Sequence, residues 1–352
     1  MDSLKNKVQT VLGVVDPSEL GRTLTHEHLS LNSKSLGFQV PDTEEIRLMQ
    51  NCPFTFENFH WISQNPYSHS DNVNIKDAVS RQAVLEEMKS FKLNGGGTVV
   101  ENTTYGLNRD IEFLKQLSME TGVHIVAGTG YYIALLQDKQ TLGMSVEELI
   151  KTMKKDLLEG VGNTDIKCGV IGELGCSYPL EPFERNVLRA AGEVQSELKC
   201  PVIIHPGRDE RSPQEIIRIL QEAGGIASKT VMSHLERTIF DLAKLSEFAS
   251  NGCYCEFDLF GLECSYYTLN PSIDMPNDAH RIMLVRHLIR QGFADKIVIS
   301  HDIHTKHRLG KYGGHGFSHI LKYVVPKMLI RDINQQEIDK ILIHNPRNWL
   351  TY

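Results

Sequence analysis

The stretch Arg22-Thr23-Leu24-Thr25-His26-Glu27-His28 has the pattern of a short β-strand that ends in two histidines. Side chains alternate between the two faces of a strand, so His26 and His28 project to one side and Glu27 to the other. Two imidazoles about 7 Å apart along one face can converge on one metal ion. The chain has 15 histidines, so the pair alone is a weak signal. Its meaning depends on the residues that end the other strands.

Seven further strand-like segments follow, and helical segments separate them. At residues 77–93, for example, apolar residues recur at roughly helical spacing, and capping patterns at Ser145–Glu148 and Ser212–Glu215 indicate where two later helices begin. The predicted helices cover residues 77–93, 109–121, 146–159, 182–198, 213–222, 238–250 and 277–291. The predicted strands cover residues 23–30, 98–104, 124–130, 168–174, 201–206, 230–235, 254–259 and 297–302.

Strands that alternate with helices predict a parallel sheet with right-handed crossovers. Eight such units in 352 residues favour a closed (β/α)8 TIM barrel with a short N-terminal β extension. Gly95-Gly96-Gly97 precedes a strand and does not lead into a helix, so it indicates a helix end and not a phosphate-binding loop. We predict one domain over residues 1–352 with a long loop insertion at residues 32–76, which is either an ordered flap near a site or a surface excursion.

The composition excludes several classes of protein. A hydrophobic content of 41% and a charged content of 23% are those of a soluble globular protein. The net charge of −7 argues against a nucleic-acid-binding protein. No apolar run approaches the roughly 18 residues that span a bilayer, and the first residues show no secretory signal. Seven cysteines without a Cys-x-x-Cys pair fit a reducing compartment. We expect a cytoplasmic protein without membrane or nucleic-acid partners. The sequence leaves open whether the protein forms a homodimer.

Histidine or acidic residues end five of the eight predicted strands. In such barrels the carboxyl ends of the strands meet at one face, where the chemistry takes place. A charged or imidazole group after an apolar strand is costly without a partner. Each residue alone could be an ion-paired or hydrogen-bonded barrel residue, and Asp302 could cap the next segment, but coincidence at five strand ends is improbable. The candidate metal ligands are His26, His28, Glu173, His205, His234 and Asp302.

Six nitrogen and oxygen ligands of this mixture suit two divalent cations. Zn²⁺ comes first by ligand type, with Mn²⁺, Co²⁺ and Fe²⁺ as alternatives. An acidic residue midway around the barrel can bridge two ions at the spacing of about 3.5–4 Å that two-metal sites show. The Ser and Cys residues show no Ser-His-Asp or Cys-His context. The pattern therefore indicates hydrolysis without a protein nucleophile.

This arrangement resembles the amidohydrolase superfamily, and the surrounding sequence is similar to its phosphotriesterase family. The resemblance covers nearly the full length and rests on Leu24-Thr25-His26-Glu27-His28, Val170-Ile171-Gly172-Glu173-Leu174-Gly175, Ile204-His205-Pro206-Gly207-Arg208 and Ser300-His301-Asp302. Bacterial phosphotriesterases place a carboxylated lysine on the fourth strand, where this chain has Glu173, and Lys167 lies too early to replace it. A glutamate matches the phosphotriesterase-homology and related-protein branches.

The resemblance implies a role for each ligand. It places a more buried ion on His26, His28 and Asp302, an outer ion on His205 and His234, and Glu173 between the two. It also implies a metal-bridging hydroxide as the nucleophile. Asp302 is then the catalytic residue, because it would orient that hydroxide and carry its proton to the leaving group.

The related-protein branch implies an amidase that acts on N-acyl taurines, chiefly N-acetyltaurine, and gives taurine and a carboxylate. Such a small anionic amide needs a cation near the metals, and the paired donors of an arginine suit a three-oxygen anion. The candidate substrate-binding residues are Arg208, Arg237, Tyr105, Arg109 and Tyr131, which follow predicted strands. A surface or ion-pair role is the alternative for each. We expect Arg208 or Arg237 to anchor the anion.

Two other functions remain open. A lactonase or phosphotriesterase would share every metal ligand, and an uncharged, apolar pocket would favour it. A non-catalytic metabolite-binding barrel would have lost at least one ligand, and all six are present. The loop at residues 304–316 holds three histidines and four glycines. We predict a mobile or tightly turned lid there, with an extra metal site as the alternative.

Overall fold

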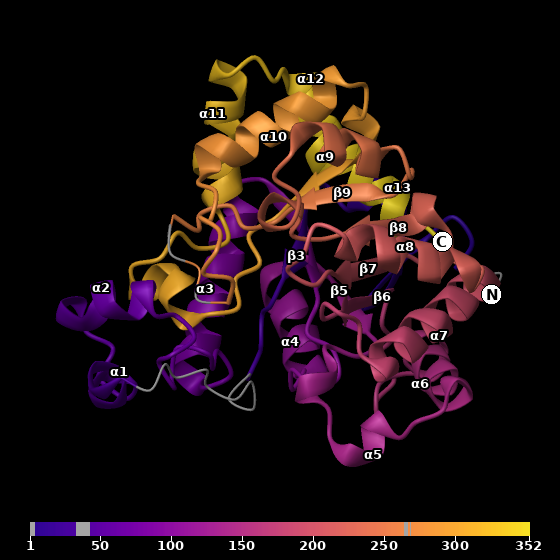
Figure 1. Cartoon of the computed structure of the whole chain (residues 1–352), viewed down its shortest axis with the longest axis horizontal. Coiled ribbons are helices and arrows are strands. Elements are labelled where there is room, and N and C mark those ends of the chain that lie inside the picture. Colours follow the sequence, from indigo (N-terminus) through magenta and orange to yellow (C-terminus); the bar gives the residue numbers. More distant parts are fainter. Residues whose placement is uncertain (1–3, 33–42, 264–266, 268) are drawn as a thin grey trace.

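Eight parallel strands form a nearly closed barrel in the computed structural model, which describes residues 4–32, 43–263, 267 and 269–352 (Figure 1). Each strand pairs with the next along the chain. The strands are β3 (Arg22–Glu27), β4 (Gly96–Glu101), β5 (His124–Thr129), β6 (Val170–Gly175), β7 (Val202–His205), β8 (Thr230–Met232), β9 (Tyr254–Phe257) and β10 (Ile297–Ile299). The Asp302 N–H donates to the carbonyl oxygen of His26 (3.0 Å), which brings the ends of β10 and β3 together. The predicted barrel is confirmed.

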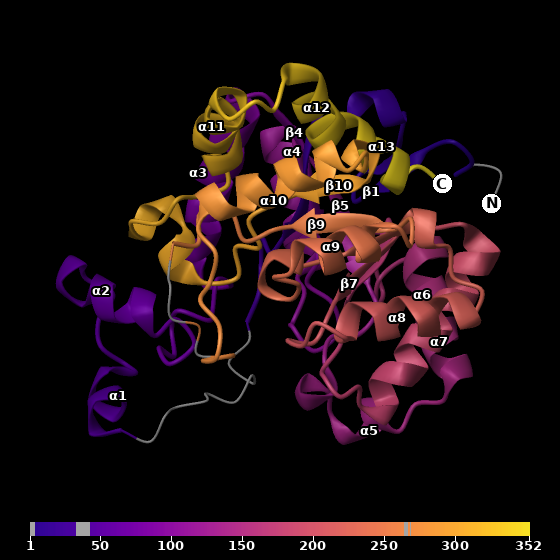
Figure 2. The same cartoon turned by 45° about the horizontal axis from the view of Figure 1, so that its top comes forward.

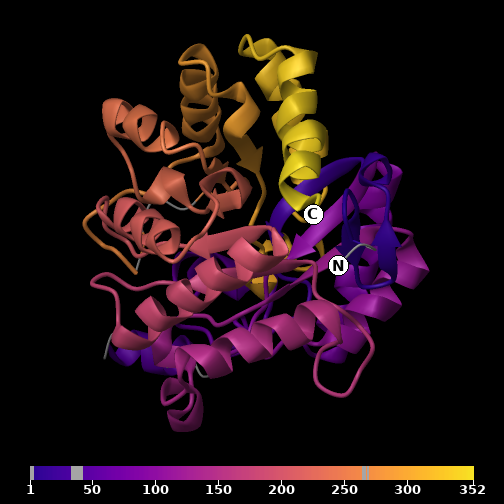
Figure 3. The ribbon, with the colours of Figure 1, turned by 90° about the vertical axis from the view of Figure 1, so that its right-hand side faces the viewer.

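Helices connect the strands and cover the outside of the barrel (Figures 2 and 3). Between the strands lie α3 (Ala78–Leu93), α4 (Ile111–Thr121), α5 (Lys139–Leu142), α6 (Val146–Leu158), α7 (Pro182–Leu198), α8 (Ser212–Glu222), α9 (Leu242–Ala249) and α10 (Asp278–Arg290). The chain continues after β10 with α11 (Val325–Ile330), α12 (Gln335–Asp339) and α13 (Asn345–Leu350). No helix of the described residues is both long and apolar enough to cross a membrane.

The first turns of α8 and α9 differ from what the sequence predicts. Ser212, predicted as the cap of α8, lies inside its first turn, and its hydroxyl accepts a hydrogen bond from the Gly207 N–H (2.9 Å). The hydroxyl therefore fixes the loop after β7. Helix α9 begins at Leu242 and not at residue 238, because the Asp241 carboxylate caps the turn that starts there.

The bottom of the barrel, at the amino ends of the strands, is closed by the two ends of the described chain. Strands β1 (Val8–Thr10) and β2 (Gly13–Val15) form an antiparallel pair, which confirms the predicted N-terminal β extension. The Tyr352 N–H donates to the carbonyl oxygen of Lys7 (3.0 Å), and its hydroxyl donates to that of Gly169 (3.1 Å). The barrel floor therefore depends on residues from both ends.

The barrel interior is apolar below its mouth. Six of the eight strands, β4 to β8 and β10, each contribute one aliphatic side chain to a compact cluster: Val100, Val126, Val170, Ile203, Val231 and Val298. All six are fully buried. This layer separates the floor from the polar residues at the carboxyl ends of the strands, and it leaves those residues to form the site.

The predicted insertion carries α1 (Glu44–Met49) and α2 (Phe56–Gln64) and then returns to the barrel mouth; its residues 33–42 lie outside the described part. Lys306 Nζ, in the loop after β10, pairs with Asp71 (2.7 Å), and the His307 N–H donates to the Asn72 side chain (2.8 Å). The end of the insertion therefore packs on that loop, as the flap interpretation expects. The division of residues 1–352 into one domain stays a prediction.

The start of β4 lies unusually close to the segment before β3. A Cβ atom added to Gly97 would lie 2.1 Å from the carbonyl oxygen of Leu20. We expect Gly97→Ala to lower the free energy of unfolding by about 1–3 kcal/mol, because backbone must move to admit the methyl group. Urea denaturation measures the change. Gly143→Ala is the matched control, since its Cβ would meet only ordinary contacts from 3.5 Å. Equal unfolding midpoints for both variants would contradict the close approach.

Candidate metal centre

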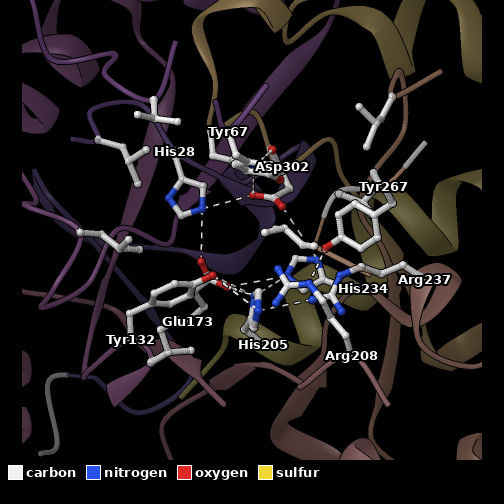
Figure 4. A pocket seen from close by; sticks show the side chains of 18 of the residues that line it. His28, Tyr67, Tyr132, Glu173, His205, Arg208, His234, Arg237, Tyr267 and Asp302 are labelled. Atoms are coloured by element: carbon white, nitrogen blue, oxygen red, sulfur yellow. Dashed lines mark hydrogen bonds and ion pairs between the residues drawn. The ribbon is translucent and has the colours of Figure 1, made fainter. Parts of the chain in front are cut away.

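The six predicted ligands lie together at the carboxyl ends of the strands, around a cavity of about 230 Å³ (Figure 4). Five of them line the cavity, and His26 is fully buried beside them: His26, His28, Glu173, His205, His234 and Asp302. His26 comes from β3, Glu173 from β6 and His205 from β7, while the other three follow the ends of β3, β8 and β10. The sequence pattern therefore predicted a real spatial cluster.

The Glu173 carboxylate occupies the middle of the cluster. Its Oε1 lies 3.2 Å from His28 Nε2, and its Oε2 lies 3.2 Å from His205 Nδ1, 3.4 Å from His26 Nε2 and 3.7 Å from His234 Nε2. Burial alone would raise the pKa of Glu173, but the charge of His26 and the hydrogen bonds of His205 and His234 hold the pKa well below its usual value. The two oxygens of one ionised carboxylate thus face different histidines.

Asp302 faces the same space from β10. Its Oδ1 lies 3.2 Å from His28 Nε2, 3.8 Å from His26 Nε2 and 3.1 Å from His304 Nδ1. Burial would raise the pKa of Asp302, but the charge of His304 and a hydrogen bond from His28 hold it well below its usual value. The φ of Asp302 is +52°, in the left-handed region that residues other than glycine rarely adopt.

Two acidic residues of β9 and its end, which the sequence analysis did not single out, support the histidines from behind. Asp258 Oδ1 lies 2.6 Å from His234 Nδ1, and its Oδ2 lies 3.1 Å from His26 Nδ1. Glu256 Oε2 lies 3.2 Å from His26 Nδ1 and accepts a hydrogen bond from the Ser233 hydroxyl (2.7 Å). The two-residue spacing of Glu256 and Asp258 was the available signal, because it places both side chains inside the barrel.

The donor set fits divalent metal ions. His26 Nε2 is buried and makes no hydrogen bond in the described part of the chain, while its Nδ1 contacts carboxylates. An imidazole fixed at one nitrogen presents the other as a ligand. Three groups of described residues have ligand atoms within 4.8 Å of one another, and two of them share the cavity wall: His26, Glu173 and His234, and His26, His28 and Asp302. The third group consists of His26, Glu256 and Asp258.

The five predicted substrate contacts separate into two sets. Arg208 and Arg237 line the cavity. Tyr105, Arg109 and Tyr131 are not among the described residues that line it. Arg109 Nη2 instead pairs with a buried Asp156 (3.1 Å), and the Tyr105 hydroxyl contacts the same carboxylate (3.4 Å). The Tyr131 hydroxyl points to Met144 Sδ (3.6 Å). These three side chains belong to the barrel wall behind β4 and β5.

Three other tyrosines line the cavity in their place. The Tyr132 hydroxyl lies 3.3 Å from His205 Nδ1, and that of Tyr67 lies 2.9 Å from His304 Nε2. The Tyr267 hydroxyl accepts a hydrogen bond from Arg208 Nε (2.6 Å). Apolar side chains complete the lining, among them Leu31, Leu107, Ile133, Leu259, Leu269 and Met275. Neighbouring residues after a strand differ in direction, so the sequence could not separate Tyr131 from Tyr132.

The loop at residues 304–316 is tightly turned. Arg308 donates hydrogen bonds to the carbonyl oxygens of Asp302 (2.6 Å) and His301, and Lys306 Nζ pairs with Asp77 (3.0 Å) as well as with the insertion. None of the metal-capable groups found among the described residues includes a histidine of this loop. The loop is therefore tightly turned, which is one of the two forms predicted for a lid. The described residues give no support to the alternative, an extra metal site.

A (β/α)8 barrel with histidines and carboxylates at the strand ends defines the class of barrel hydrolases that bind metal ions at the barrel mouth. Within that class, a sequence model of the phosphotriesterase family matches residues 6–350. The chain therefore belongs to the phosphotriesterase family.

Relatives and solved structures cover the whole chain. Full-length relatives named N-acetyltaurine hydrolase are 52% identical in Danio rerio and 53% identical in Homo sapiens, each over 352 residues and all of both chains. A crystal structure of a resiniferatoxin-binding protein from Rhodobacter sphaeroides is similar with a TM-score of 0.94 and 28% identity, over 99% of this chain and 96% of that one.

The Asp258 carboxylate contacts the rear nitrogens of both His26 and His234. We expect Asp258→Asn to weaken metal binding about 10- to 100-fold, because partners behind metal-binding histidines fix their tautomer and orientation. Competition with a chelator, read by elemental analysis, measures the change. Asp165→Asn is the control, since the Asp165 side chain is 89% exposed. Equal metal retention in both variants would show that Asp258 does not orient the ligands.

Proposed function

We propose that the protein is a metal-dependent amidase that hydrolyses N-acetyltaurine, and other N-acyl taurines, to taurine and a carboxylate. The observation that carries the proposal is one cavity that holds the six-residue cluster together with Arg208 and Arg237. The cluster suits hydrolysis, and the two guanidiniums suit an anionic substrate. The full-length similarity to relatives named N-acetyltaurine hydrolase supports this substrate.

The chain would hold two metal ions. We assign His26, His28 and Asp302 to one ion, His205 and His234 to the other, and Glu173 to a position between them. The different directions of the two Glu173 oxygens support this division. When bound, two divalent ions supply an activated water and polarise the scissile carbonyl oxygen. The nitrogen and oxygen donors favour Zn²⁺, with Mn²⁺, Co²⁺ and Fe²⁺ as alternatives.

Residues of the chain would move the proton. Asp302 stays ionised in its buried position, so its Oδ1 can accept a proton from the attacking water and pass it to the leaving amine. Burial raises the pKa of Tyr132 well above its usual value, so its hydroxyl stays protonated as a hydrogen-bond donor to the cavity. The leaving group is then taurine, whose sulfonate lies against Arg208 and Arg237.

The alternatives have less support. A lactonase or phosphotriesterase would use the same cluster, and the apolar lining residues would suit it. Two arginines in the same cavity favour an anionic substrate instead. A non-catalytic barrel would share the fold of the resiniferatoxin-binding protein, but retention of all six candidate ligands favours catalysis. The free cysteines of the described residues support a reducing, cytoplasmic compartment. A homodimer stays a prediction.

Zinc-loaded protein tests the reaction on a panel of N-acetyltaurine, other N-acetyl amino acids, a lactone and paraoxon. We expect taurine release from N-acetyltaurine. Asp302→Asn should lower kcat by roughly 100-fold or more, as expected for loss of a general acid–base group. Metal analysis of the variant separates lost chemistry from lost metal. Activity on the lactone or on paraoxon alone would show that the proposed substrate is wrong, and it would still agree with the proposed metal centre.

Arg237 tests the anchor for the sulfonate. We expect Arg237→Met to raise the KM for N-acetyltaurine about 10- to 100-fold, because a hydrogen bond to a charged group is lost. The KM for an uncharged amide of the same length should change little. Arg211→Met is the matched control, because Arg211 is exposed and pairs with Asp209. A KM for N-acetyltaurine that stays at the unmutated value would remove Arg237 from the substrate site.

A further inference from the structure

The cavity contains two positive charges without a negative partner. Arg237 is only 3% exposed, and Arg208 is partly buried. Neither guanidinium has a carboxylate within ion-pair distance among residues 4–32, 43–263, 267 and 269–352. A shielded charge without a partner is costly. Within the described part of the chain, these two cations therefore lack a counter-charge, which a bound anion can supply.

Two other buried arginines of the described residues pair with carboxylates within the fold. Arg109 pairs with Asp156 (3.1 Å), and Arg281 pairs with Asp278 (2.9 Å). The carboxylates next to the cavity are committed to histidines: Glu173, Asp258 and Asp302 all form their recorded ion pairs with imidazoles. Arg308 is buried as well and donates to the carbonyl oxygens of Asp302 and His301, but it does not line the cavity. Among the described arginines, Arg208 and Arg237 combine a missing carboxylate partner with a place in the cavity wall.

The contacts of the two guanidiniums are neutral and leave donors for a ligand. Arg208 Nε donates to the Tyr267 hydroxyl (2.6 Å), and the guanidinium lies 5.6 Å from the centre of that ring. Arg237 Nη2 donates to the carbonyl oxygen of Pro206 (3.3 Å). These contacts fix the positions of the side chains without cancelling their charge. The rigid placement makes the pair a ready-made anion site.

Both guanidiniums face one part of the cavity. Figure 4 shows Arg208 and Arg237 together beside His234 and His205. Arg237 Nη2 lies 3.3 Å from His205 Nε2. One small anion at this end of the cavity would therefore interact with both arginines.

A sulfonate neutralises only one of the two charges. A phosphonate has the same tetrahedral shape with three oxygens, and above its second ionisation it carries two negative charges. We propose that the subsite of Arg208 and Arg237 is built for a dianion, and that the protein hydrolyses N-acyl 2-aminoalkylphosphonates more efficiently than N-acyl taurines. This inference rests on the proposed amidase function. Water adds across the amide bond, the C–N bond breaks, and the products are a carboxylate and the protonated 2-aminoalkylphosphonate.

The test compares N-acetyl-2-aminoethylphosphonate with N-acetyltaurine, which differ only in the anionic group. The measured quantity is the ratio of their kcat/KM values with metal-loaded protein. At about pH 8 we expect kcat/KM to be about tenfold higher for the phosphonate. One additional contact between charged groups contributes enough free energy for this difference. The preference should vanish at about pH 5, below the second ionisation of such groups near pH 6. The sulfonate does not titrate in this range, so pH effects on the protein cancel in the ratio.

Substitutions at Arg208 connect the preference to the arginine pair. Arg208→Gln should clearly lower the ratio at about pH 8, because one remaining cation attracts the second negative charge of the phosphonate more weakly than two cations do. Arg208→Lys keeps the charge and should retain most of the preference. Arg211→Gln, at the exposed arginine nearby, should leave the ratio unchanged.

Three results would overturn the inference while N-acetyltaurine is still cleaved. The first is a ratio at or below one at about pH 8. The second is a preference of the same size in Arg208→Gln as in the unmutated protein. The third is a phosphonate that only inhibits, with the same affinity in Arg208→Gln, because it then binds away from the arginine pair.

Failure of N-acetyltaurine turnover itself would instead count against the proposed function. In that case calorimetric binding of the two free amines, taurine and 2-aminoethylphosphonate, decides whether the subsite prefers a dianion. Tighter binding of the phosphonate that is lost in Arg208→Gln supports the inference. Equal binding of the two amines overturns it.

Discussion

The arrangement of the barrel mouth depends on one buried carboxylate among four imidazoles. Glu173 lies within 3.7 Å of His26, His28, His205 and His234. A lone carboxylate there would be expelled or protonated, and lone imidazoles would be unfavourable so far from water. Their mutual attraction keeps all five in place and brings the ends of four strands to one point. The same ionised oxygens are what a pair of divalent ions would require.

A second layer of charge explains why these histidines hold their orientations. Asp258 contacts the rear nitrogens of His26 and His234, Glu256 contacts that of His26, and the cluster of valine and isoleucine side chains lies below. From floor to mouth the interior therefore changes from apolar residues to carboxylates and then to imidazoles. The carboxylates behind the site provide hydrogen-bond partners for the imidazole nitrogens that face away from the cavity. The substrate end of the cavity has no such partner for its arginines, and this contrast separates structural charges from charges available to a ligand.

The sequence predicted the parts of the structure that depend on local pattern. Alternation of strands and helices gave the barrel, and a charged residue after an apolar strand marked each candidate ligand, as at His205 and Asp302. What it could not resolve depends on directions that only the fold determines. Arg109 has the same place after a strand as Arg208, yet a buried Asp156 turns it into the wall. Asp258 was overlooked because it supports ligands from behind and gives no separate motif.

The contact between Tyr352 and Lys7 has a consequence for biosynthesis. The Tyr352 N–H donates a hydrogen bond to the carbonyl oxygen of Lys7, and the Tyr352 hydroxyl donates one to the carbonyl oxygen of Gly169. Gly169 lies near the middle of the sequence. A ribosome delivers the first of these residues long before the others, and domains fold as units as they emerge. The floor can close only after residue 352 has left the exit tunnel. Strands β3 to β10 end at residue 299, so they are all synthesised before these floor contacts can form.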